Sequence, residues 1–165
     1  MKKSRLIKRI LTIIIYILLI PIILWNLIIM VQTIKNPNET PSVYGIKTFC
    51  IISGSMEPYI QINDVVVIKE VPQNEINKGD IITFDVKGEK ITHRITNIEA
   101  DENGELIYTT KGDANNIEDE TKVTFEDIEG KYIGKIPKVG KIIMALKSKT
   151  TVFIILAILI LLYFI

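Results

Sequence analysis

The 165-residue sequence is poor in the residues that build disulfides and metal sites, with one cysteine, Cys50, and one histidine, His93. A single cysteine cannot form an intramolecular disulfide, so a folded domain must draw its stability from its core. One histidine, one cysteine and dispersed acids also lack the spacing of metal ligands, and we expect no metal and no other cofactor. Cys50 lies in an apolar run, where a small buried hydrophobic role is expected.

Acidic residues are absent from the first 35 positions, which hold six lysines and arginines. The remainder holds 14 basic and 19 acidic residues, so its net charge is 14 minus 19, or −5. Nucleic-acid binding requires a basic surface that displaces phosphate counterions. The charge distribution therefore argues against a nucleic-acid partner.

A basic tail, residues 1–9, precedes 25 uncharged positions at 10–34, a run long enough to span a bilayer. A cleavable signal peptide would have a shorter apolar core and a small-residue cleavage site, but no alanine occurs before Ala100. We predict an uncleaved transmembrane helix at 10–34. The positive-inside rule places its N-terminus in the cytoplasm and residues 35–149 on the extracytoplasmic side.

A second uncharged run covers residues 150–165. As a helix it would measure about 24 Å, slightly less than a hydrocarbon core of about 30 Å. Lys147 and Lys149 could extend its reach by snorkelling. We predict a second transmembrane helix here, and thus a multi-pass protein of the cell membrane; a helix lying in the interface is the alternative.

Between a linker at 36–42 and residue 136, short apolar or alternating runs are separated by turn residues. This pattern predicts a mainly β, antiparallel domain. Hairpin loops are expected at 86–90 and 101–104. The predicted strands are 46–53, 64–71, 80–86, 90–99, 105–110 and 131–136.

Residues 51–58 read Ile-Ile-Ser-Gly-Ser-Met-Glu-Pro. If the chain stays extended through Gly54, the hydroxyls of Ser53 and Ser55 share one face and could address one carbonyl. Gly54 also permits close approach of another backbone. Serines in such a segment are commonly only turn residues. We nevertheless take Ser55 as the candidate nucleophile.

A serine nucleophile needs a base, and the single histidine is the first candidate. Strand alternation in residues 91–95 turns His93 inward and Arg94 outward. A lone inward histidine is more often a hydrogen-bonded core residue than a catalyst. The segment 108–119 offers two acids, Asp113 in a glycine-asparagine turn and Asp119 six residues later, and either could orient an imidazole.

Four segments occur in a fixed order: Ser-Gly-Ser-Met-Glu-Pro at 53–58, Gly-Asp-Ile-Ile at 79–82, Thr-His-Arg-Ile at 92–95 and Lys-Gly-Asp-Ala-Asn-Asn-Ile-Glu-Asp at 111–119. Together they resemble type I signal peptidases over residues 10–140, and each alone would be weak. Histidine rather than lysine at position 93 is similar to the endoplasmic-reticulum-type branch.

The resemblance implies a serine endopeptidase, signal peptidase I, in which Ser55 is the nucleophile and His93 the general base. It implies that Asp119 orients the imidazole and that Asp113 supports the site. The backbone N–H of Ser55, with Ser53 in the lysine-type branch, would stabilise the oxyanion. Gly54 and Met56 complete the predicted oxyanion and substrate-binding segment.

The resemblance also implies the partners. The substrates would be secretory preproteins with small residues at positions −1 and −3, bound as an added β-strand at the bilayer surface. Association with the translocation machinery is a further expectation. Two alternatives stay open: a serine-lysine protease using Lys90 or Lys111 as its base, and a non-catalytic, membrane-anchored β module.

Overall fold

The computed structural model describes residues 2–35, 40–147, 153–154 and 157. It divides the chain into two compact units, one formed by residues 1–41 and 142–165 and one by residues 42–141. We call the second the β unit. The predicted second transmembrane helix, 150–165, lies almost wholly outside the described residues.

The N-terminal helix, α1, runs from Lys2 to Lys35. Its part from Arg9 to Lys35 is 27 residues, long and apolar enough to cross a membrane. At a rise of 1.5 Å per residue this stretch measures about 40 Å. Pro21 lies inside the helix. The helix predicted at 10–34 is therefore present, and it is the only span of this kind in the described part of the chain.

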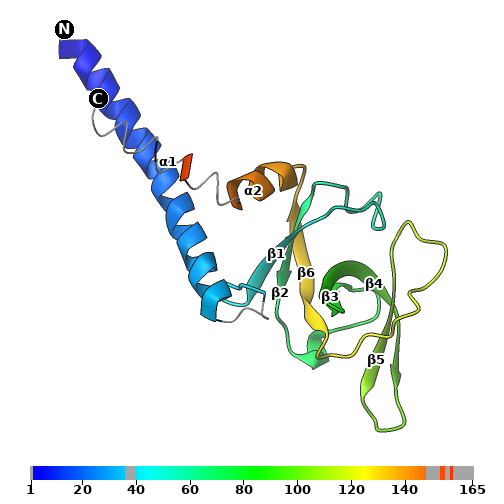
Figure 1. Cartoon of the computed structure of the whole chain (residues 1–165). Helices are drawn as coiled ribbons and strands as arrows, with labels where there is room; N and C mark the ends of the chain where they lie inside the picture. Colours follow the sequence, from blue (N-terminus) through cyan, green and yellow to red (C-terminus); the bar gives the residue numbers. More distant parts are fainter. Residues whose placement is uncertain (1, 36–39, 148–152, 155–156, 158–165) are drawn as a thin grey trace. The chain divides into compact units, whose positions relative to one another are not determined.

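The β unit contains one six-stranded antiparallel sheet in the order β1-β2-β6-β3-β4-β5 (Figure 1). A short 3-10 turn, η1 (Gln73–Glu75), follows β2, and α2 (Gly140–Lys147) follows β6. The strands are β1 (Ile46–Cys50), β2 (Val65–Lys69), β3 (Ile81–Val86), β4 (Glu89–Ala100), β5 (Leu106–Lys111) and β6 (Ile128–Ile136). The predicted antiparallel β architecture is confirmed.

Turn chemistry fixes the β3–β4 hairpin. Val86 pairs with Glu89, so Lys87 and Gly88 form the two-residue turn. Both have positive φ, 53° and 90°. Two positive φ angles match the twist of antiparallel strands in a type I′ turn. The hairpin sets the register that places His93 opposite Ile82.

Two apolar clusters form the core. The first contains Ile76, Ile82, Phe84, Ile95, Tyr108 and Val123. The second contains Met56, Ile60, Val66, Ile68 and Ile81. Met56 and Ile60 belong to the segment that carries Ser55, and both are fully buried. The serine turn is therefore fastened to the core on its C-terminal side.

A buried carboxylate fastens the next turn. Asp64 is 1% exposed and accepts hydrogen bonds from Lys135 Nζ and from the backbone N–H groups of Gln61 and Lys138. Burial opposes its charge, but these donors outweigh burial and lower the pKa of Asp64. This contact links the end of β6 to the turn before β2.

Candidate active site

Ser55 lies in a turn that follows β1. The predicted strand 46–53 is too long, because β1 ends at Cys50. The Ile51 N–H donates to Asp64 O at 2.9 Å, and a turn closes with the Glu57 N–H donating to Gly54 O at 3.0 Å. The chain is thus not extended through Gly54, yet the hydroxyl oxygens of Ser53 and Ser55 lie 3.3 Å apart.

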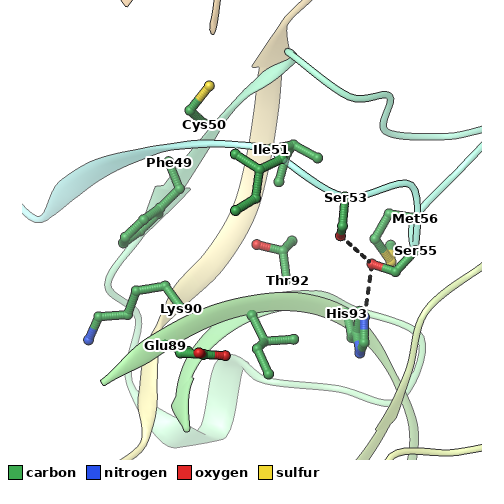
Figure 2. A pocket seen from close by; sticks show the side chains of 12 residues that line it. Phe49, Cys50, Ile51, Ser53, Ser55, Met56, Glu89, Lys90, Thr92 and His93 are labelled. Carbon is green, nitrogen blue, oxygen red and sulfur yellow. Dashed lines mark hydrogen bonds between the residues drawn. The ribbon is translucent and has the colours of Figure 1, made fainter. Parts of the chain in front are cut away.

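The serine faces the only histidine of the sequence. Ser55 Oγ lies 3.0 Å from His93 Nε2, and Figure 2 shows this contact together with the one to Ser53. His93 is held on β4, is 7% exposed, and contacts the Phe84 ring edge-on. Strand alternation correctly predicted its inward direction. Packing therefore fixes the position of the imidazole ring, and its Nε2 atom contacts the Ser55 hydroxyl.

The other imidazole nitrogen meets a carboxylate. His93 Nδ1 lies 2.6 Å from Asp119 Oδ2. An ionised carboxylate only accepts, so Nδ1 carries the proton and Nε2 is left to accept from Ser55. The three side chains form one hydrogen-bond chain. Of the two acids that the sequence left open, the structure brings Asp119 to His93.

Asp113 lies elsewhere on the same loop. It receives two hydrogen bonds from Arg94, Nε to Oδ1 at 2.8 Å and Nη2 to Oδ2 at 2.7 Å. Hydrogen bonding to Asp113, against a smaller effect of burial, raises the pKa of Arg94. Arg94 also donates to Gly79 O and lies over the Tyr59 ring. The structure therefore places Asp113 beside Arg94, on the outward face of β4.

The loop that carries both acids also touches the serine. The Ala114 N–H donates to Ser55 O at 2.9 Å. A Cβ added to Gly112 would lie 2.6 Å from the same Ser55 oxygen. Only glycine permits this approach without displacement of one segment. One loop thus positions the nucleophile at one end and Asp119 at the other.

A groove of about 640 Å³ leads to Ser55 and His93. Its walls are residues 49–53 and residues 89–93 (Figure 2). These belong to β1 and β4 with their flanks, which three other strands separate in the sheet order, so the sheet curls to bring them together. Met56 lines the groove while its side chain is buried in the core.

Lys90 lies on the groove wall but is occupied. Its ammonium group contacts Asp85 Oδ2 at 2.6 Å and also Glu129. Burial disfavours its charge, but the two carboxylates outweigh burial and raise the pKa of Lys90. A raised pKa keeps this lysine protonated at neutral pH. Lys90 is therefore unsuited to act as a general base.

Sequence reasoning missed two supporting residues. Thr110 Oγ1 donates to Asp119 Oδ2 at 2.7 Å, and Arg94 holds Asp113. Arg94 lies within one motif that the sequence singled out and Thr110 directly precedes another, yet nothing local distinguishes them from ordinary strand residues. Within the described ranges, no group of three or more His, Cys, Asp or Glu side chains could hold a metal ion.

Comparison with known proteins connects this geometry to a family. The chain is 32% identical to "Signal peptidase I W" of Bacillus subtilis over 123 residues, which are 73% of this chain and 64% of that protein. It is 30% identical to the human "Signal peptidase complex catalytic subunit SEC11C" over 101 residues, 56% of this chain and 53% of that protein.

A third relative is "Signal peptidase complex catalytic subunit SEC11" of Eremothecium gossypii, 35% identical over 54% of this chain and 59% of that protein. The matches thus span between about half and two thirds of the relatives' lengths. No family model matches the chain. The sequence similarity shows that this chain is a homologue of type I signal peptidases, including the SEC11-type catalytic subunits.

Proposed function

We propose that the chain is a membrane-bound serine endopeptidase that removes signal peptides from secretory preproteins. The observation that carries the proposal is the hydrogen-bond chain from Ser55 through His93 to Asp119, at one end of a groove in a homologue of signal peptidases. A nucleophile, a base and an orienting acid in contact are the parts that acyl transfer needs.

In the proposed reaction, Ser55 Oγ attacks the scissile carbonyl carbon while His93 Nε2 takes the hydroxyl proton. The resulting imidazolium is stabilised by Asp119. His93 then returns the proton to the leaving amine, and an acyl group stays on Ser55. A water molecule, deprotonated by His93, attacks the acyl carbon. His93 returns that proton to Ser55 Oγ as the ester bond breaks, which releases the product and the free serine.

The oxyanion requires donors that are not already used. The backbone N–H of Ser55 donates to no protein acceptor within the described chain, and the Ser53 hydroxyl lies beside Ser55 Oγ. We assign both to the oxyanion, with Gly54 and Met56 shaping the turn. One such donor is typically worth about 100-fold to 1,000-fold in rate.

The substrate is assigned to the groove between residues 49–53 and 89–93. An extended preprotein segment could lie along these walls as an added strand. Small side chains at positions −1 and −3 would suit the part of the groove beside Ser55, where Ile51 and Thr92 belong to the lining. Preproteins arrive in the bilayer, so α1 would keep enzyme and substrate at the same surface.

Topology completes the proposal. The basic tail, residues 1–9, lies in the cytoplasm, and the helix at 10–34 anchors the protein in the cell membrane. Residues 35–149 lie on the extracytoplasmic side, and residues 150–165 span the bilayer again. In intact spheroplasts, external protease should digest the middle segment and spare tags at both ends. Digestion of the C-terminal tag would contradict the proposal that residues 150–165 span the bilayer.

The test of the activity is cleavage of one purified preprotein by the purified full-length protein. Ser55→Ala should give no cleavage above background, because only the attacking oxygen is lost. Ser4→Ala, which removes a hydroxyl outside the β unit, is the matched control and should cleave normally. Mass spectrometry of the products locates the scissile bond. Normal cleavage by Ser55→Ala would favour the non-catalytic β module.

The serine-lysine alternative is tested by the base. A histidine base must be neutral to accept the Ser55 proton, so activity should fall on acidification. His93→Ala should be inactive, whereas Lys90→Gln and Lys111→Gln should retain activity. Activity that persists in His93→Ala and requires pH well above 8 would assign the base to a lysine.

A further inference from the structure

Thr110 meets Asp119 at two points. Its hydroxyl Oγ1 donates to Asp119 Oδ2 at 2.7 Å, and its carbonyl accepts from the Asp119 N–H at 2.8 Å. The side chain lies on β5 and exposes no surface. Oδ2 is also the oxygen that faces His93 Nδ1 at 2.6 Å. One carboxylate oxygen is thus shared by the imidazole and by a buried threonine.

We infer that Thr110 is a positioning residue: it fixes the Asp119 carboxylate so that Oδ2 faces His93. The inference rests on the proposed function for its kinetic consequence, although the contact itself is independent of any substrate. Thr110 acts through Asp119, because its hydroxyl donates to that carboxylate and Thr110 does not line the groove.

The physical need for such a residue follows from where Asp119 lies. It follows β5 by a loop, residues 112–118, and a carboxylate on a loop can rotate about its side-chain bonds. Thr110 belongs to a strand, and its branched side chain has a restricted χ1. A hydroxyl has one proton, which Thr110 gives to Oδ2. The hydrogen bond from this strand residue thereby restricts rotation of the Asp119 carboxylate.

The orientation matters because the carboxylate fixes the imidazole in turn. Asp119 Oδ2 holds the proton on Nδ1, and the opposite nitrogen then faces Ser55 Oγ at 3.0 Å. If the carboxylate turned away, it would no longer fix the orientation of the imidazole or keep the proton on Nδ1. Loss of the Thr110 hydroxyl should therefore slow the chemical step and leave substrate binding nearly unchanged.

The matched variants are Thr110→Ser, which keeps the hydroxyl, and Thr110→Ala, which removes it from the same shortened side chain. Thr110→Ala should lower kcat by about 10-fold to 100-fold relative to Thr110→Ser, as expected for a hydrogen bond to a charged group. KM should change less than about twofold. Thr109→Val is the control, because its hydroxyl accepts from Lys122 and not from the site.

A second readout needs no activity. His93 is the only histidine in the sequence, so the low-field proton resonance of its Nδ1–H can be assigned without ambiguity in protein purified without a histidine tag. The resonance should be present in wild type, Thr110→Ser and Thr109→Val. In Thr110→Ala it should move upfield or be lost by exchange, while thermal unfolding confirms that the protein is folded.

The outcomes separate this inference from the proposed function. If Thr110→Ala keeps the wild-type resonance and the kcat of Thr110→Ser, Thr110 is not a positioning residue. If kcat falls but Thr110→Ala keeps the wild-type resonance, or if thermal unfolding shows that Thr110→Ala is not folded, the role is structural and the inference fails. If the resonance responds as expected while wild type cleaves no preprotein, the positioning contact stands and the proposed function falls.

Discussion

The segment of residues 112–119 that follows β5 carries two aspartates that face opposite sides of β4. Asp119 contacts His93, and Asp113 contacts the next residue along the strand, Arg94. The two carboxylates are about equally exposed, 21% for Asp119 and 19% for Asp113, but the side chain of His93 is only 9% exposed. Arg94 is 36% exposed. Strand alternation thus turns the side chains of His93 and Arg94, which are neighbours in the sequence, to opposite faces of β4.

The difference teaches how similar contacts acquire different roles. Asp119 is linked through His93 to a hydroxyl at the mouth of a groove, whereas Asp113 is linked through Arg94 to a backbone carbonyl and an aromatic ring. The inward contact can orient the base that exchanges a proton with Ser55 and can stabilise its imidazolium form. The outward contact can only hold the loop. The contact distances are alike in the two pairs, 2.6 Å for His93 with Asp119 and 2.7 to 2.8 Å for Arg94 with Asp113, so the third partner of each pair decides its role.

The largest effect should come from the inward carboxylate. Asp119→Asn keeps the size of the side chain but cannot balance an imidazolium, and it favours the wrong tautomer of His93. We expect kcat to fall by about 10⁴-fold, with the melting temperature nearly unchanged. Steady-state kinetics and thermal unfolding check this. An Asp119→Asn protein with full activity would contradict the proposed role.

A third carboxylate sharpens the comparison because it is buried yet outside the hydrogen-bond chain. Asp64→Asn should lower the free energy of unfolding by about 2 to 3 kcal/mol at pH 7, the cost of losing hydrogen bonds to a charged group. The folded pKa of Asp64 is depressed. Its stabilisation is therefore complete above the ordinary value of 3.8 and is lost as the pH falls through the folded pKa.

Urea unfolding of wild type and Asp64→Asn between pH 7 and pH 3 measures this contribution. The difference between the two proteins should be constant down to pH of about 5 and should narrow below that. A difference that stays equal across the whole range would mean that the contact stabilises through packing and not through charge.

The third prediction concerns the loop's contact with the nucleophile. In Gly112→Ala the new methyl group would lie 2.6 Å from Ser55 O, so one segment must move. A misplacement of about 1 Å can cost about 100-fold in rate, and we expect a loss of that order. Gly134→Ala is the control, because its added methyl meets no atom within 4 Å. Equal activity of the two variants would show that the loop yields without moving Ser55.

Most of the fold follows from local patterns in the sequence. Alternating apolar runs located all six strands, and Lys-Gly at 87–88 located a hairpin. The strand ends were predicted wrongly where contacts with segments distant in the sequence determine them. β1 stops at Cys50, since the Asp64 N–H that would extend the pairing with β2 donates to Gln61 O within its own turn. β6 begins at Ile128, three residues earlier than predicted. Gly130, with φ of 156°, reads as a turn residue but lies within β6 close to the backbone of Lys69.

The candidate site was predictable in its residues, and the pairing of His93 with Asp119 was implied by the family resemblance but not by local sequence reasoning. The serine segment, the single histidine and the two acids stand out by composition and order. Neither the choice of Asp119 over Asp113 nor the contact with Thr110 could be read locally, because the path of the 112–118 loop depends on Ser55 O and Arg94. Cys50 is only half-buried, beside Gly140, where full burial was expected.

The smallest effect should come from the outward carboxylate, and it completes the comparison. Asp113→Asn leaves one acceptor for Arg94 and weakens a bidentate, partly exposed pair, which is worth about 1 kcal/mol. For a domain of this size that corresponds to a fall in melting temperature of about 4 to 8 °C. The rate should fall by about 10-fold, because the Ala114 N–H on the same loop holds Ser55 O.

The control is Glu118→Gln, which removes a charge from the same loop at a carboxylate that accepts from Thr96 Oγ1. It should alter neither rate nor melting temperature measurably. Combining Asp113→Asn with Arg94→Gln tests the mechanism: if the two residues act as one contact, the double variant should lose no more stability than the more damaging single variant. A stable but inactive Asp113→Asn protein beside an active Asp119→Asn protein would exchange the two roles, since the carboxylate needed for chemistry would then be the one that Arg94 holds.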